Sequence, residues 1–556
     1  MILNVEKNIK NYPGQKLKEN KNISFKGPID GVVTQTLMAI NTNPMINAAA
    51  VDVGSMVIPR TYIDTKKRNK YAGFETFFRE LTGTVIVCLS AGVAAMGIAS
   101  IHNKSILKEI NIKPKIWATN ETFDALRNHW EKSEKNVNKY IKNIFSDLSG
   151  SNGKNIEKWN DINWNKVNWY DDSSWSKIKW DNNKWKNIAS KTKDGDQIIE
   201  VFSELIKDKS ASKKDVKNVI KILEQRISNS LRADQSINIS SGDKSISTNL
   251  RNLIRDAHDL GKEIFGSGVD LNKAEHKLKS MNKLKSTGAV GLVSLVGLGN
   301  QSFNRYLTKK RTGKDDFVGE NNYENSKIKK DSKAAKQQNL RLIGLKAVAS
   351  LGFLALALRV MKVKNPKEFL KKIELKSAVT SGNAIKTIFT ATLIGRFLAA
   401  RNETELRESC TRDYLAFFNW LVLGNFVSKG VAQLLDKKQE NLFNVIEDGS
   451  KGIKKWFNNV SLKSYREIAA NGGEFAKKNV WKLNVANAAG LLYSGIALGC
   501  AIPLLNIFIT NRKNSKTKPL EHQTSNITFG MNNFPKVFEN FYGNQIDASK
   551  TLKGAN

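Results

Sequence analysis

Two long apolar blocks without a formal charge constrain this 556-residue chain more than any other feature. Leu81 to Asn103 runs for 23 residues and Leu483 to Asn511 for 29 residues without Lys, Arg, Asp or Glu. A helix rises about 1.5 Å per residue, so either block is long enough to cross a hydrocarbon layer about 30 Å thick. Pro503 lies inside the second block, and proline is tolerated in membrane helices. We therefore predict two membrane-spanning helices.

Weaker apolar blocks lie between these two, at 286–304, 341–361, 379–400 and 414–434. Each is short, glycine-rich or interrupted by arginine, so each is either a short span or a buried helix of a soluble fold. The predicted fold class is mainly α: a multi-pass helical membrane protein with an inserted soluble helical domain.

Small residues recur at helical spacing inside both long blocks. Ala91, Ala95 and Ala99 follow one another every four residues, and Gly495 and Gly499 form a Gly-x-x-x-Gly pair. Such stripes let helix backbones approach closely, so these five residues are candidates for helix packing. The alternative is that Gly and Ala are simply frequent in membrane helices.

The domain organisation follows from where charge and apolar residues alternate. We expect the following segments in chain order: a basic disordered arm at 1–30 without a cleavable signal peptide; an N-terminal region at 31–103 that ends in the span 81–103; a basic soluble helical domain at 104–285; a helical region with the weaker spans at 286–435; a basic amphipathic connector at 436–482; the span 483–511; and a basic flexible tail at 512–556.

The formal charge of +37 makes polyanions the expected partners. Anionic lipid is favoured, nucleic acid is less favoured, and a protein partner could bind the 104–285 domain. The connections between the apolar blocks are all rich in Lys and Arg, so the positive-inside rule does not orient the chain.

Within 104–285 the apolar positions have helical spacing. Ile198 to Ile206 and Val216 to Leu231 each follow it, and Ser210-Ala211-Ser212 lies between them. Serine favours the N-cap of a helix, so we predict a helical hairpin with its turn at these residues.

The same domain holds a tryptophan ladder at 159–185: Trp159, Trp164, Trp169, Trp175, Trp180 and Trp185. Steps of five or six residues turn the side chain around a helix axis, so the rings form no stripe. The ladder is either an inert low-complexity insertion or a contact with a membrane interface, where indole rings favour the headgroup layer. Stacking on nucleic acid is less favoured, because Lys154 to Lys186 carries seven basic and five acidic residues and is nearly neutral.

A second interfacial candidate is Trp456, within the stretch Lys451 to Ile468. Basic and apolar residues alternate there as in an amphipathic helix that lies on anionic lipid, although a soluble helix has nearly the same pattern.

A possible internal repeat aligns 75–80 with 403–408, which share four of six residues. Each segment enters an apolar block, which would suit transporter-like pseudo-symmetry. The charges involved are candidate membrane-edge groups, Arg79, Glu80, Arg396, Arg407 and Glu408, or else ordinary helix-entry charges.

Catalytic and metal-binding motifs are absent from the sequence: there is no phosphate loop, no dinucleotide fingerprint, no His-Glu-x-x-His and no Gly-x-Ser-x-Gly. Three separated cysteines and five histidines predict neither a disulfide framework nor a metal centre. The sequence identifies no catalytic residue, cofactor or small-molecule substrate, so an enzyme is the less favoured class. The favoured function is a non-enzymatic membrane scaffold or interaction protein; the alternatives are a channel or transporter subunit and a soluble polyanion binder.

Overall fold

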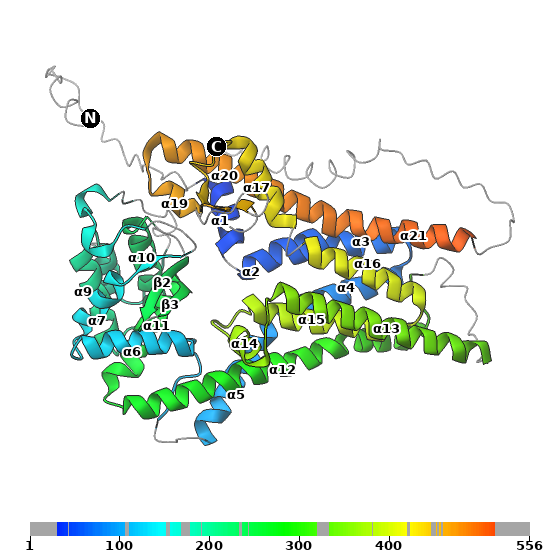
Figure 1. The fold of residues 1–556 in the computed structure, drawn as a ribbon, viewed down its shortest axis with the longest axis horizontal. Coiled ribbons are helices and arrows are strands. Elements are labelled where there is room, and N and C mark those ends of the chain that lie inside the picture. Colours follow the sequence, from blue (N-terminus) through cyan, green and yellow to red (C-terminus); the bar gives the residue numbers. More distant parts are fainter. Residues whose placement is uncertain are drawn as a thin grey trace, which may run out of the picture. The chain divides into compact units, whose positions relative to one another are not determined.

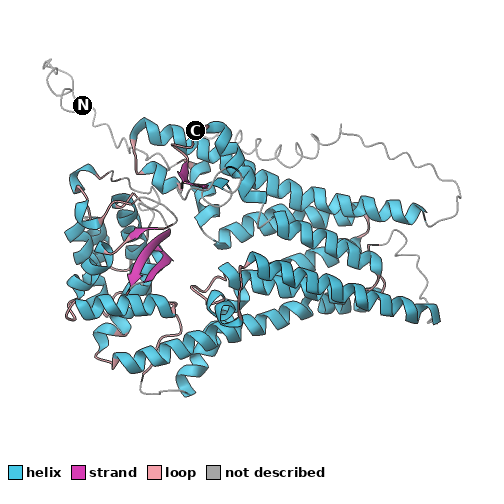
Figure 2. Ribbon diagram, viewed as in Figure 1, coloured by secondary structure: helices cyan, strands magenta, loops and turns pink. Residues whose placement is uncertain are grey.

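The computed structural model describes residues 31–42, 44–105, 110–151, 156–167, 169, 178–190, 192–232, 236–242, 244–319, 333–380, 382–419, 423–445, 452, 455–456 and 460–516. The chain divides into two compact units, Met1–Ile507 and Phe508–Asn556. The first unit is described below. The fold is mainly helical, as predicted (Figures 1 and 2).

The elements in chain order fall into an N-terminal group, a lobe and a C-terminal group. The N-terminal group is α1 (Val32–Thr42), α2 (Pro44–Asn47), the π-helical η1 (Ala48–Val57), α3 (Ile58–Lys67), α4 (Lys70–Val85), the π-helical η2 (Ile86–Ser90) and α5 (Ala91–Ser105). The lobe holds α6 (Asn120–Lys132), α7 (Val137–Ser146), β1 (Ser149–Gly150), the short 3-10 helices η3 (Trp159–Asp161) and η4 (Trp164–Lys166), α8 (Asn183–Ser190), α9 (Gly195–Lys207), α10 (Lys213–Ser230), β2 (Ser236–Ser241), β3 (Lys244–Asn249), α11 (Leu250–Glu263) and η6 (Phe265–Ser267).

The C-terminal group begins with α12 (Leu271–Thr312), which leaves the lobe. It continues with α13 (Lys333–Val360), α14 (Pro366–Lys372), α15 (Gly382–Ala399), α16 (Glu403–Phe418), α17 (Gly424–Leu435), β4 (Phe443–Val445), β5 (Val460–Leu462), α19 (Tyr465–Ala469), α20 (Gly473–Ser494), the π-helical η9 (Gly495–Ala501) and α21 (Ile502–Lys516).

The lobe, which comprises the described residues of 110–283, folds around its own hydrophobic core. The predicted hairpin is confirmed: α9 and α10 are joined at 208–212, and the Ser212 side chain caps α10 by accepting a hydrogen bond from the Asp215 amide. An antiparallel sheet in the order β1-β2-β3 adds Ile237 and Ile239 to the core. The helical spacing of apolar residues in this domain therefore corresponds to helices that pack around one shared core.

Asp256 on α11 is a buried carboxylate in this lobe and predicts a pH dependence. Burial raises its pKa to about 6, although the neighbouring Arg255 opposes the shift. Between pH 4 and 6 the folded carboxyl keeps a proton that the unfolded chain has released, so stability falls as pH rises through this window. We expect Asp256→Asn to match the wild type at pH 4 and to exceed it at pH 7, by on the order of 2 kcal/mol. Thermal melting followed by tryptophan fluorescence at both values measures this, and equal differences at the two values would contradict it.

The remaining helices pack side by side as a bundle, defined as η1 to α5, residues 286–312 of α12, α13, α15 to α17 and α20 to Ile507. Three helical stretches are long and apolar enough to cross a membrane: Lys70–Lys104, Asn339–Val360 and Gly473–Arg512. The first and third contain the two long apolar blocks, and the second coincides with the weaker block 341–361. The blocks 286–304, 379–400 and 414–434 lie in α12, in and before α15, and in α16 to α17.

The connector at 436–482 differs from the predicted amphipathic helix. Phe443–Val445 and Val460–Leu462 pair as antiparallel strands β4 and β5. A capping box at Ser464 and Glu467 then starts the short helix α19. The prediction of one helix across Lys451 to Ile468 is therefore wrong, because strand pairing and the cap divide that stretch.

Candidate functional site

A buried set of ion pairs lies between the helices of the bundle, and we call it the polar core. It consists of six arginines and six carboxylates that pair within 4 Å: Arg60, Arg68, Arg79, Arg396, Arg401, Arg412, Asp64, Glu75, Glu80, Glu405, Glu408 and Asp413. Equal numbers of cations and anions leave no surplus charge within this set. Charges at such depth are costly unless paired, so each of these groups depends on its partner.

Arg396 on α15 lies at the centre of the polar core. Its Nη2 is 3.1 Å from Oε2 of Glu80 on α4, and its Nη1 is 3.2 Å from Oδ1 of Asp413 on α16. All three side chains are nearly excluded from solvent. One guanidinium thus joins three helices through charge-assisted hydrogen bonds, which are stronger than neutral ones.

Two arginines at the ends of α3 and α15 make crossed pairs. Arg401, which follows α15, places Nη2 2.5 Å from Oε1 of Glu75 on α4. Arg68, which follows α3, places Nη2 2.8 Å from Oε2 of Glu408 on α16. Helices α3 and α4 form one hairpin and helices α15 and α16 form a second, so each arginine pairs with the second helix of the other hairpin. The two hairpin turns are held together at one end of the bundle.

Arg60 on α3 connects the polar core to η9. Its Nη1 is 3.4 Å from Oε1 of Glu80, and its Nε donates a 2.7 Å hydrogen bond to the carbonyl of Leu498. Leu498 lies in the π-helical stretch, where a backbone carbonyl can lose its usual helical partner. The arginine therefore satisfies a helix backbone and a carboxylate at once.

A polar face of α12 completes the site around Glu75. Asn304 Nδ2 donates to the Glu75 carbonyl at 3.0 Å, Thr308 Oγ1 donates to the carboxylate at 3.1 Å, and Gln301 Nε2 donates at 3.2 Å. Nearby, Thr82 Oγ1 donates to Asn300 at 3.0 Å. The Glu75 carboxylate is thus held by two side chains of α12 as well as by Arg401.

The polar core joins the helices through ion pairs and charge-assisted hydrogen bonds. No group of three or more His, Cys, Asp or Glu among the described residues has the geometry of a metal site. Every carboxylate of the polar core has an arginine within 4 Å, so none is left as a free general base.

Of the predicted membrane-edge charges, Arg79, Glu80, Arg396 and Glu408 belong to the polar core, and Arg407 lies half-buried on α16 beside Glu408. The sequence did not single out the other eight members. Each arginine, taken alone, resembles an ordinary charge at a helix end. One pattern in the sequence does indicate these members. The dipeptide Arg-Asn occurs at both hairpin turns, as Arg68-Asn69 and Arg401-Asn402, and a glutamate follows each arginine by seven residues.

The tryptophan ladder lies largely against the lobe. Trp159 and Trp185 are buried, whereas Trp164, Trp169 and Trp180 are half-buried, and Trp175 lies outside the described residues. Ring centroids are 4.7 Å apart for Phe145 and Trp159 and 4.9 Å apart for Trp159 and Trp164. The buried rings contact protein, so an interfacial role remains a prediction only for the partly exposed members.

The helix-packing candidates lie at close contacts. Ala91, Ala95 and Ala99 are fully buried on α5, and α5 packs against α12. Gly499 meets the backbone of η1: a Cβ there would lie 2.1 Å from the Ser55 carbonyl oxygen, and Gly495 faces the same serine. A larger side chain at Gly499 would push η9 away from η1.

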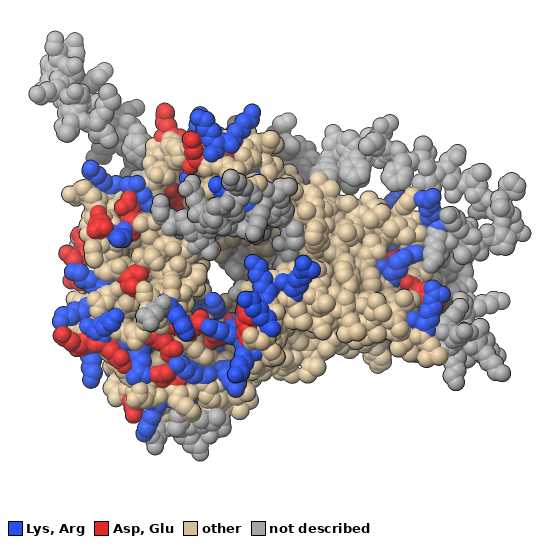
Figure 3. Space-filling model, viewed as in Figure 1, with Lys and Arg blue, Asp and Glu red and all other residues tan. Residues whose placement is uncertain are grey.

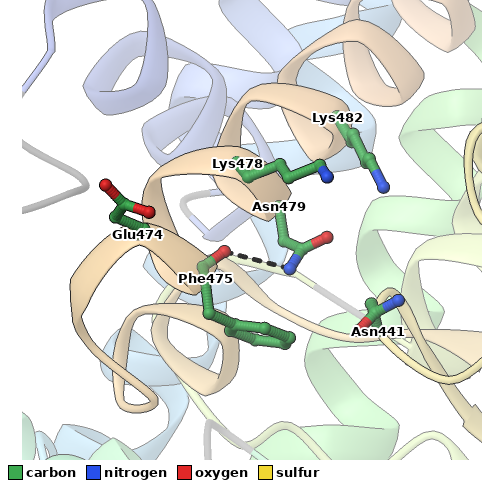
Figure 4. A pocket seen from close by; sticks show the side chains of 6 residues that line it. All are labelled: Asn441, Glu474, Phe475, Lys478, Asn479 and Lys482. Carbon is green, nitrogen blue, oxygen red and sulfur yellow. Dashed lines mark hydrogen bonds between the residues drawn. The ribbon is translucent and has the colours of Figure 1, made fainter.

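A recess of about 310 Å³ lies beside α20, lined by Asn441, Glu474, Phe475, Lys478, Asn479 and Lys482. The ammonium groups of Lys478 and Lys482 extend on the same side of the helix, and Glu474 points away from them (Figure 4). Trp456 lies outside this recess: its ring stacks on Phe426 with centroids 5.3 Å apart, and Lys429 lies 5.0 Å above it.

No family model, no curated protein and no solved structure matches this chain.

Proposed function

We propose that the chain is an integral membrane protein that acts as a non-enzymatic scaffold and presents its helical lobe at an anionic membrane surface. A single contrast carries the proposal. Large hydrophobic side chains are exposed throughout the bundle, yet none of the described residues of 110–283 exposes one. One chain thus hides its apolar side chains where water is the solvent and displays them where lipid would be.

The exposed apolar residues form a surface of the right kind for lipid. Val348 and Leu351 on α13 are 71% and 66% exposed, and Leu295 on α12 is 67% exposed. Figure 3 shows a broad band over α12, α13 and α15 without charged side chains on that face, bordered by Lys and Arg at both ends. Val85, in the first apolar block, is 46% exposed.

Membrane residence is tested by alkaline carbonate washing of membranes from cells that express the full chain. We expect the protein to stay in the membrane pellet, because helices solvated by lipid resist the wash. Release into the supernatant would overturn the proposal and favour the soluble polyanion binder.

The recess beside α20 supports the contact with anionic lipid. Lys478 and Lys482 lie within the first turns of the Gly473–Arg512 stretch, where a membrane surface would be, and a basic residue near an anionic surface contributes about 1 kcal/mol. We expect Lys478→Gln with Lys482→Gln to weaken the apparent affinity for phosphatidylglycerol roughly 30-fold, as two such contributions imply. Thermal shift of the detergent-solubilised protein during lipid titration measures it. Lys477→Gln, on the same helix but outside the recess, is the matched control. An equal loss in the control would point to general charge rather than to this recess.

A channel or transporter subunit is the second candidate, and the polar core favours it because ionisable groups between membrane helices often mark ion routes. The even pairing of the polar core favours the scaffold instead. Flux through reconstituted vesicles that disappears in Arg396→Gln, while the protein stays folded, would favour transport.

A further inference from the structure

Two hairpins in the bundle have the same polar pattern at one constant offset along the chain. Arg68, Asn69, Glu75, Thr76, Arg79 and Glu80 correspond to Arg401, Asn402, Glu408, Ser409, Arg412 and Asp413. This register differs from the alignment of 75–80 with 403–408, which is therefore wrong. Sequence identity alone favoured the other register, because its four matches fall within six consecutive residues, whereas the equivalent polar positions are spread from 68 to 80.

The equivalent residues make equivalent contacts. Arg79 Nη2 donates to Thr76 Oγ1 at 3.1 Å, as Arg412 Nη2 does to Ser409 Oγ at 3.4 Å. The crossed pairs Arg68–Glu408 and Arg401–Glu75 are also exchanged by the correspondence. A reciprocal pair of contacts is what a two-fold axis produces.

The helices that follow the turns agree in their irregularities. Asn69 and Asn402 each cap the next helix, accepting from the amide three residues later. The π-helical stretch Ile86–Ser90 corresponds to residues 419–423, of which Asn419 and Leu423 are described and π-helical. A π-helical stretch at the same position in both copies supports a common origin, whereas η1 and η9 have no π-helical counterpart in α15 and α12.

A third helix belongs to each copy. Asn304 on α12 donates to the Glu75 carbonyl at 3.0 Å, and Asn506 on α21 donates to the Glu408 carbonyl at 3.1 Å. In the register that these asparagines set, Leu271 and Gly473, the first residues of α12 and α20, also correspond. In the same register Gly297 corresponds to Gly499. Gly297 faces Thr392, and Gly499 faces Pro59, which is the residue equivalent to Thr392 in the first hairpin.

Two side chains lie between the copies. Arg396 binds Glu80 and its counterpart Asp413 at nearly equal distances. The Phe317 ring has the guanidinium groups of Arg68 and Arg401 at 5.8 Å and 5.9 Å. The approximate axis passes through both.

We infer that the bundle consists of two parallel copies of a three-helix unit. The first copy is η1–α3, α4–η2–α5 and α12. The second is α15, α16–α17 and the helix formed by α20, η9 and the α21 residues up to Ile507. The copies run the same way, because both hairpin turns meet at one end through the crossed pairs. The structure thereby assigns both hairpin turns to one end of the bundle. The insertions, which connect the second helix of each copy to its third helix, lie at the other end.

Those insertions are the lobe in the first copy and the segment 436–472 in the second, and they touch. Arg466 on α19 places Nη1 3.0 Å from Oε1 of Glu224, a fully buried residue of α10 in the lobe. In a membrane, the lobe and the 436–472 segment form one head on one side, and the turns and the end of α12 face the other side. This sidedness rests on the proposed membrane residence.

The test is labelling with a membrane-impermeant maleimide in sealed vesicles of one orientation. Single variants Lys139→Cys and Lys438→Cys place thiols on the head, and Lys66→Cys and Lys310→Cys place them at the opposite end; all four lysines are exposed. The parent chain with its three native cysteines sets the background. In sealed vesicles we expect the variants at 139 and 438 to give the same labelling result and the variants at 66 and 310 to give the opposite one. Inverted vesicles should exchange the two results, and opened vesicles should label all four variants.

The outcomes separate the two proposals. Labelling of all four positions in sealed vesicles would overturn membrane residence. Labelling of 139 and 438 from different sides, or of 66 and 310 from different sides, would overturn the parallel duplication and leave residence intact.

A second measurement needs no membrane sidedness. Glu80→Asp and Asp413→Glu should each lower the melting temperature of the detergent-solubilised protein, and the double exchange should recover at least half of their summed loss, because Arg396 can shift toward the shortened side chain. Additive losses would contradict the equivalence of the two carboxylates. The control is Glu131→Asp, at an exposed member of an ion pair in the lobe. Combined with either Glu80→Asp or Asp413→Glu, it should leave the loss of melting temperature unchanged.

Discussion

Arg401→Ala is expected to destabilise the bundle by about 3–5 kcal/mol, the usual cost of removing one partner from a buried ion pair. Arg401 is the cation paired with both Glu75 and Glu405, and all three side chains are at most 6% exposed. Its loss would leave two buried carboxylates uncompensated. Denaturation of the solubilised protein, followed by circular dichroism, measures the change.

Arg341→Ala provides the matched control for this prediction. Arg341 also pairs with a glutamate, Glu403, at 3.3 Å, but its side chain is 73% exposed. Exposed pairs contribute about 0–1 kcal/mol. Equal losses for the two variants would mean that the polar core is open to water, contrary to the structure.

Leu351→Arg is expected to expel α13 from the membrane or to prevent its insertion. Leu351 lies in the middle of the Asn339–Val360 stretch and is 66% exposed. An arginine at the centre of a membrane helix costs about 2.5–3.5 kcal/mol, whereas an ordinary surface substitution in water changes stability by about 0.5 kcal/mol or less. The fraction of protein that resists carbonate extraction should fall sharply.

Leu351→Met keeps the volume and apolar character of the side chain and serves as the control. It should behave as the wild type. A Leu351→Arg variant that folds and fractionates like the wild type would show that this face is solvated by water.

Much of the secondary structure could be predicted because its causes are local. The Ser212 cap and the apolar spacing on both sides of it predicted α9 and α10, and both helices are present. The two long uncharged blocks similarly located two of the three helical stretches that are long and apolar enough to cross a membrane. The prediction of an amphipathic helix at Lys451 to Ile468 was wrong because β5 pairs with residues 443–445, which lie outside the stretch with the amphipathic pattern.

The polar core could not be predicted as a site for a comparable reason. Arg401 and Glu75 are far apart in sequence, and nothing local to either residue identifies the other. The lone alignment of 75–80 with 403–408 detected a relationship between the two hairpins but placed it in the wrong register. Only the contacts of Arg68, Arg401 and Phe317 show which residues are equivalent.

The sequence by itself determined most helical segments and which of them are long and apolar enough to cross a membrane, because helix capping and hydrophobic transfer depend on nearby residues and on composition. The tertiary structure alone decided which arginine pairs with which carboxylate and which ladder tryptophans are buried. An ion pair requires two groups within 4 Å, and the burial of a ring requires a cavity of matching shape. Distant segments create both of these conditions only when they pack together.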